Sequence, residues 1–175
     1  MPQPEIDLDP VSHLTADAIG KPGQRVFYIQ AWQNDTVITL LVEKVQIQTL
    51  AVEVEHFMEE VNHQFPDLPE ASTEYDEDKM HILPPVDPLF RVGEISLAYD
   101  AERDILILGT REVLMEGQEP EEARSVRFWC TRSQVSAMCH WGLEIANRGR
   151  PICPQCGEPM DPEGHFCPKK NGHKH

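Results

Sequence analysis

The sequence QRVFYIQAWQNDTVITLLV at residues 24–42 decides the fold that we expect for this chain. Residues 24–33 and 36–42 are rich in β-branched and aromatic side chains, which favour strands. Asn34 and Asp35, between the two runs, are typical turn residues. The segment therefore predicts a β-hairpin.

An amphipathic helix is predicted directly after this hairpin. Its apolar residues recur at steps of three and four positions, which places them on one face of a helix, and glutamates fall largely on the other side. The apolar positions are Ile47, Leu50, Ala51, Val54, Phe57, Met58 and Val61.

The second half of the chain repeats this order. Strands are predicted over 91–99, 104–111 and 125–130, followed by a helix that Thr131 and Gln134 start as a capping box. Residues 43–51 align without a gap with 131–139, so that Gln46 falls on Gln134. An early strand over Ile6–Leu14 would complete a βββα unit in each half. Either the unit is duplicated, or two amphipathic helices resemble each other through their common period.

The sequence thus predicts an α+β fold in which one or two antiparallel sheets are covered on one face by two helices. We expect an acidic body over residues 1–150, with halves at 1–64 and 90–150 and a proline-rich linker at 65–89. Residues 151–175 are too few to bury a core of their own, so they need a metal ion or a surface to pack on.

The chain of 175 residues has a formal net charge of −15. Acidic and basic residues balance in 151–175, so the body carries the whole excess. Such a surface repels nucleic acid and anionic lipid, and we expect neither as a partner. The sequence shows no secretory signal and no apolar run long enough for a membrane span, which predicts a cytoplasmic protein.

Cysteine and histidine residues near the C-terminus predict a metal site. Cys153 and Cys156 have the C-x-x-C spacing of a zinc-binding turn, and His165, Cys167 and His173 follow. Two sets of four ligands are possible: Cys153, Cys156, His165 and Cys167, or the same three cysteines with His173. We expect a structural zinc ion, because three thiolates make zinc a poor Lewis acid. Cys130 and Cys139 lie in apolar contexts and are expected to be buried.

Several motifs in order give the chain a resemblance to a bacterial family, the domain of unknown function 3090 family. They are PGQR at 22–25, FYIQA at 27–31, EKVQ at 43–46, DPLFRVG at 87–93 and the cysteine-containing segment at 149–168. The resemblance implies a zinc-ribbon-like tail with Cys153, Cys156, His165 and Cys167 in its pattern. The family has no assigned activity. Its members tend to be encoded beside kinase-like and phosphatase-like proteins, which implies a shared pathway.

Lys21, Arg25 and Arg91 are candidate contacts for an anionic ligand in this acidic protein. The sequence contains no GxSxG motif and no Ser/His/Asp grouping that would name a nucleophile. We therefore expect a non-enzymatic zinc-binding interaction or accessory module with a protein partner. The alternative is an enzyme, or a binder of small anionic ligands, with a pocket between the two halves.

Overall fold

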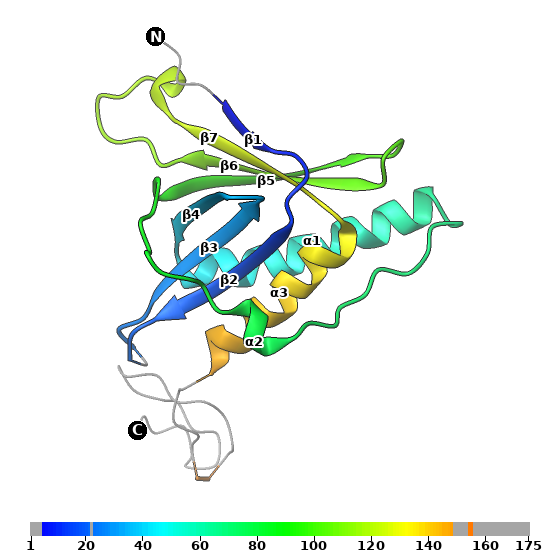
Figure 1. Ribbon diagram of the computed structural model, residues 1–175, viewed down its shortest axis with the longest axis horizontal. Helices are drawn as coiled ribbons and strands as arrows, with labels where there is room; N and C mark the ends of the chain where they lie inside the picture. The colour runs from blue at the N-terminus through cyan, green and yellow to red at the C-terminus, as the bar shows by residue number, and fades with distance from the viewer. Residues whose placement is uncertain (1–4, 22, 149–153, 156–175) are drawn as a thin grey trace.

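The computed structural model describes residues 5–21, 23–148 and 154–155 and has an α+β architecture, which confirms the expected fold class. It contains two β-sheets, two long helices and two short helical turns (Figure 1). The strands are β1 (Glu5–Leu8), β2 (His13–Ile19), β3 (Val26–Gln33), β4 (Thr36–Val42), β5 (Val92–Asp100), β6 (Ile105–Glu112) and β7 (Ser125–Cys130). The helices are α1 (Lys44–Gln64), α2 (Glu77–Met80), η1 (Pro120–Glu122) and α3 (Arg132–Asn147).

The two sheets have the strand orders β2-β3-β4 and β1-β7-β6-β5. In each sheet the three consecutive strands are antiparallel, whereas β1 joins β7 in parallel, with Glu5 opposite Ser125. The single early strand expected over Ile6–Leu14 is wrong. Two strands occupy this region, and the first of them belongs to the sheet of the other half.

Two chain segments cross from one sheet to the other. The amide of Val11 donates to Trp129 in β7, and the next amide, Ser12, donates to Trp32 in β3. At the opposite edge, the amide of Leu41 in β4 donates to Phe90, and the carbonyl of Arg91 accepts from Val113. The sheets are therefore tied together at both edges.

The hydrophobic core extends over both sheets and both long helices. Figure 1 shows α1 and α3 packed on the common inner side of the sheets, and α3 lies against β2. Trp141 and Val135 of α3 are fully buried. Gly142 lets α3 approach both neighbours, since an added Cβ would lie 2.9 Å from Ile47 Cγ2 of α1 and 3.8 Å from Ala16 Cβ of β2. The burial of Cys130 and Cys139, expected from the sequence, is confirmed.

The two halves share the element order βββα, as β2-β3-β4-α1 and β5-β6-β7-α3. The positions matched by the alignment also share their environments. Ile47, Leu50 and Ala51 are buried in α1, and their counterparts Val135, Met138 and Cys139 are buried in α3. This agreement in three dimensions favours the duplicated unit over a chance similarity of helices.

The linker packs along the outer face of the β2-β3-β4 sheet. The buried side chain of Gln30 donates to the Leu83 carbonyl (3.2 Å) and accepts from the Leu83 amide (2.9 Å), so it pairs with the linker as a neighbouring strand would. Asp17 accepts from the Ile82 amide (3.0 Å) and lies 3.2 Å from His81 Nδ1. These contacts fix the linker where it leads into β5.

Candidate functional site

A pocket of about 490 Å³ opens where β3, β4, the first residues of α1 and the end of the linker meet. We call it the β3–β4 pocket. Most of its lining residues belong to the first half of the chain, whereas Pro88 and Arg91 come from the segment that leads into the second half. Its volume is in the range of sites for small organic molecules. It is lined by Gly23, Arg25, Val26, Phe27, Tyr28, Leu41, Val42, Glu43, Lys44, Pro88 and Arg91.

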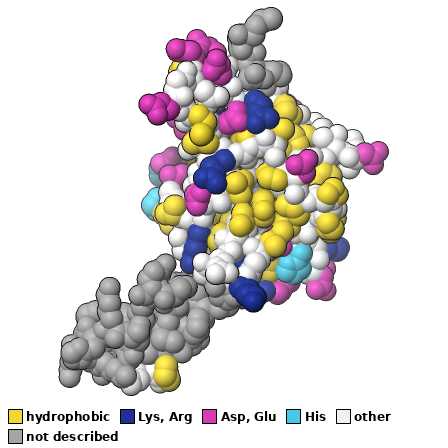
Figure 2. All heavy atoms as spheres, turned by 90° about the vertical axis from the view of Figure 1, so that its left-hand side faces the viewer, with side chains coloured by type: hydrophobic (Ala, Val, Ile, Leu, Met, Phe, Trp, Pro, Cys, Tyr) yellow, Lys and Arg dark blue, Asp and Glu magenta, His cyan; other side chains and the backbone are white. Residues whose placement is uncertain are grey.

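The floor of the pocket is apolar. Tyr28 and Leu41 pair across β3 and β4, and the side chain of Val26 is 42% exposed. Side chains alternate between the two faces of a strand, so Val26, Tyr28 and Leu41 share the face that points away from the helices. Figure 2 shows hydrophobic side chains gathered on this side of the molecule, with lysine and arginine side chains at their margin.

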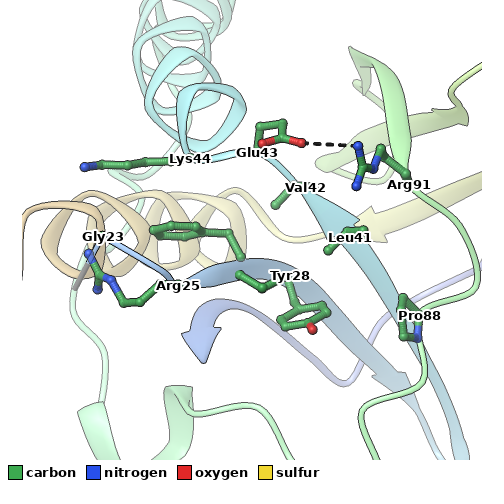
Figure 3. A pocket seen from close by; sticks show the side chains of 11 residues that line it. Gly23, Arg25, Tyr28, Leu41, Val42, Glu43, Lys44, Pro88 and Arg91 are labelled. Atoms are coloured by element: carbon green, nitrogen blue, oxygen red, sulfur yellow. Dashed lines mark ion pairs between the residues drawn. The ribbon is translucent and has the colours of Figure 1, made fainter. Parts of the chain in front are cut away.

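Three cationic side chains line the pocket, and they lie at its two ends. Arg25 and Lys44 are at one end and Arg91 is at the other (Figure 3). Glu43 is the one acidic residue among the described lining residues. The whole chain has 30 acidic and 15 basic residues, so the balance of charge is reversed here relative to the protein as a whole.

Arg91 is held by a weak ion pair. Its Nη1 lies 3.7 Å from Glu43 Oε1, and the two side chains are 57% and 59% exposed. An exposed pair of this kind contributes about 0–1 kcal/mol, because water screens both charges. An anionic ligand could therefore replace Glu43 as the partner of Arg91 at little cost.

Arg25 also has a structural role. Its Nη1 donates to the Ile145 carbonyl in the last turn of α3 (2.6 Å), and its guanidinium carbon lies 5.2 Å from the centre of the Phe27 ring. The positive charge suits the negative end of the helix dipole. These contacts hold the guanidinium against the end of α3, so Arg25 contributes positive charge at this end of the pocket while its Nη1 is engaged by a backbone carbonyl.

Two of the three candidate anion contacts, Arg25 and Arg91, line the same pocket. Lys21 lies in the turn between β2 and β3, where its carbonyl accepts from the Gln24 amide, and it does not line the pocket. Lys44 and Tyr28 also line the pocket, but they were not predicted as ligand contacts from the sequence. The signal that could have found Tyr28 is the strand alternation that places it beside Val26 on the face opposite the core.

The predicted zinc ligands Cys153, Cys156, His165 and Cys167 lie outside the described residues, as does the alternative ligand His173. Within residues 5–21, 23–148 and 154–155, no group of three or more His, Cys, Asp or Glu side chains is arranged to hold a metal ion. The β3–β4 pocket offers charged and apolar contacts. Its described lining contains no serine, cysteine or histidine that could act as a nucleophile.

Among the helices of the described chain, none combines the length and the apolar composition that crossing a membrane requires. No curated protein and no solved structure matches this sequence. A family model, described as a protein of unknown function (DUF3090), matches residues 6–167, which is most of the chain. The chain therefore belongs to the DUF3090 family of proteins of unknown function.

Proposed function

We propose that the β3–β4 pocket binds a small organic anion with an apolar body, and that the protein acts by binding rather than by catalysis. One observation carries the proposal. In a chain with twice as many acidic as basic residues, three cations and one acid line a pocket with an apolar floor. A pocket of this kind favours a ligand that buries apolar surface and places an anionic group near Arg91.

The binding energy would come from two sources. Apolar contact with Val26, Tyr28 and Leu41 contributes about 25 cal/mol for each Å² of surface removed from water. A hydrogen bond from the Arg91 guanidinium to a carboxylate or phosphate adds about 1–1.5 kcal/mol, because the 57% exposed side chain remains partly screened by water. Either contribution alone gives weak binding, so a ligand with both properties should be selected over one with only one of them.

Calorimetric titration with four probes tests this proposal. Benzoate and phenyl phosphate carry both an apolar ring and an anionic group, benzyl alcohol lacks the charge, and inorganic phosphate lacks the ring. We expect the first two to bind more tightly than the last two. The substitution Arg91→Gln should weaken benzoate binding by about tenfold, which corresponds to the loss of one charge-assisted hydrogen bond.

Lys79→Gln is the matched control, because it removes an exposed cation outside the pocket. It should leave the affinity for benzoate unchanged at constant ionic strength. The proposal fails if none of the probes binds, or if Lys79→Gln and Arg91→Gln weaken binding equally. The second result would mean that the probes respond only to net charge.

A second candidate function concerns the C-terminal residues. We propose that Cys153, Cys156, His165 and Cys167 bind a structural zinc ion, and that the zinc-bound segment is an interaction module for a protein partner in the cytoplasm. The match to the family model ends at residue 167, so it includes these four residues and leaves out His173. This supports the first of the two possible ligand sets. A kinase-like or phosphatase-like protein remains the partner class that the family resemblance implies.

Metal analysis of the full chain, purified without chelators, tests the zinc site. We expect about one zinc ion per chain, and Cys153→Ser should release it without reducing the helix signal of the body. Cys139→Ala is the control, because it removes a buried thiol elsewhere. Retention of zinc by Cys153→Ser, or a chain that carries none, would contradict this assignment.

A further inference from the structure

Strand β5 has one edge that is only partly covered. β6 pairs with β5 along its length, whereas β4 reaches the other side only at an isolated parallel bridge between Leu41 and Arg91. β4 ends at Val42, and the chain leaves the edge as α1. In the described part of the chain, no other strand continues along β5 beyond this point.

The backbone groups that point to this open edge can be identified. The amide of Glu112 in β6 donates to Arg124, on the side of β7. Backbone groups alternate in direction along a strand, so Gly109 and Arg111 point to β5, where their partners are Ser96 and Glu94. It follows that Ile95, Leu97 and Tyr99 direct their N–H and C=O groups away from β6.

The side chains at these positions are incompletely buried. Ile95, Leu97 and Tyr99 face inward but are only half-buried, whereas Leu106 and Leu108 on the neighbouring strand β6 are fully buried. The difference arises because no strand of the described chain lies beyond β5, and only α1 and the ring of Phe65, 5.8 Å from that of Tyr99, partly cover this row. One further strand would form hydrogen bonds with the free backbone groups of this edge and would complete the burial of the Ile95, Leu97 and Tyr99 side chains.

A groove of about 200 Å³ runs between this edge and α1, and we call it the β5 groove. Gln46 marks its beginning, since its Nε2 donates to the Val92 carbonyl (3.0 Å) where β4 stops. The groove is lined by Val45, Gln46, Thr49, Leu50, Glu53, Gly93 and Ile95, and it shares none of these residues with the β3–β4 pocket.

We propose that the β5 groove binds an extended segment of a partner protein, which pairs with β5 as an added strand. The unpaired N–H and C=O groups of Ile95 and Leu97 require a backbone as their partner, and the groove between an edge strand and a helix gives it room. The inward side chains of the partner segment are apolar, because they pack on Ile95, Leu97 and Leu50. Its charged residues are lysine or arginine, because Glu53 is the one charged residue in the described lining.

A second copy of this chain fits the groove poorly. Pairing of β5 with its own copy would bring two strands together that each carry Glu94 and Asp100, next to two copies of Glu53. Each chain also has a net charge of −15, so the two copies would repel. The partner segment is therefore expected to be basic.

Selection of linear peptides from a displayed random library on the full chain tests the proposal. We expect the selected sequences to alternate apolar residues with lysine or arginine. Binding of a selected synthetic peptide should slow amide exchange at Ile95 and Leu97, as measured by NMR, whereas Ser96 and Ala98 should already exchange slowly in the free protein. N-methylation of the peptide amides that face β5 should abolish binding, and N-methylation of the alternate amides should not.

Charge reversal on the protein gives an independent measurement. Glu53 and Glu55 are both exposed on α1, but only Glu53 lines the β5 groove. Glu53→Lys should lower the affinity for the selected peptide by about tenfold, and Glu55→Lys should change this affinity by less than about twofold. The proposal is overturned if no peptide is selected, if protection appears away from β5, or if Ile95 and Leu97 become protected with rising protein concentration alone. The last result would make a second copy the occupant.

Discussion

Gln46 and Gln134 make the same pair of hydrogen bonds at equivalent positions in the two halves of the protein. Gln46 Oε1 accepts from the Glu43 amide (2.7 Å) and its Nε2 donates to the Val92 carbonyl (3.0 Å). Gln134 Oε1 accepts from the Thr131 amide (2.8 Å) and its Nε2 donates to the Val11 carbonyl (3.3 Å). In both halves, one glutamine ties the start of a helix to a segment that crosses between the sheets.

Gln46→Leu and Gln134→Leu should each lower the free energy of unfolding by about 1–2 kcal/mol, because each removes a helix cap and leaves a valine carbonyl without its partner. Urea denaturation of the full chain measures the effect. Gln64→Leu changes an exposed glutamine at the end of α1 and should be nearly neutral. If one substitution left the free energy of unfolding unchanged and the other lowered it, the two glutamines would have the same geometry but different contributions to stability.

Gly142→Ala should destabilise the protein by about 1–2 kcal/mol, although alanine is the better helix former. The added methyl would lie 2.9 Å from Cγ2 of the buried residue Ile47, at the contact of α1 with α3. Ile47→Leu removes this methyl from the Cβ atom, so the double variant should be more stable than the sum of the two single changes predicts. Strictly additive energies in urea denaturation would contradict the close approach.

Asp104→Asn should reduce stability at neutral pH by roughly 2–4 kcal/mol, because it leaves the guanidinium of Arg132 without its charge partner. The Arg132 side chain is 5% exposed, whereas that of Asp104 is 39% exposed, which places the cost below that of a fully buried pair. Asn tolerates the left-handed backbone at this position, where φ is 51°. Asp87→Asn, at an exposed position, is the control.

The same pair predicts the effect of acid. Hydrogen bonds from Arg132 hold the pKa of the Asp104 carboxyl below its usual range, and Arg124 does the same for the pKa of Glu112. A carboxyl with a depressed pKa stabilises the fold above its unfolded pKa, and this contribution is lost as the pH falls through the folded pKa. Thermal unfolding should therefore show the gap between the native chain and Asp104→Asn closing below about pH 4. A gap that persists in acid would mean that the cost is steric.

Counting reactive thiols should separate the body from the C-terminal residues. Burial raises the pKa of the Cys139 thiol to about 12 and that of Cys130 also well above its usual value, so neither should react in the native protein. Of the five cysteines in the chain, the remaining three should react with a thiol reagent after chelation and slowly without it. Three fast-reacting thiols before chelation would contradict the zinc site.

Local periodicity predicted much of this fold. The hairpin from Val26 to Val42, the buried faces of α1 and α3, and the capping box at Thr131 all follow from residues close together in the chain. The place of β1 could not be predicted, because its pairing with β7 depends on contacts far apart in sequence. The candidate site shows the same division. Arg25 and Arg91 stood out as cations, but the contact of Arg25 with Ile145 depends on where α3 ends in space.

The pairing of β1 with β7 has a consequence for synthesis on the ribosome. Glu5 and its partner Ser125 are separated by 120 residues, so at ordinary elongation rates β1 leaves the ribosome roughly 6–24 s before its partner is made. During this time the β2-β3-β4 hairpins and α1 can form, whereas β1 has no edge to join. A nascent chain stalled before β7 would therefore expose β1 to chaperones and proteases. The native four-stranded sheet can therefore be completed only after β7 is made, when α3 is the one long helix of the described chain still to be synthesised.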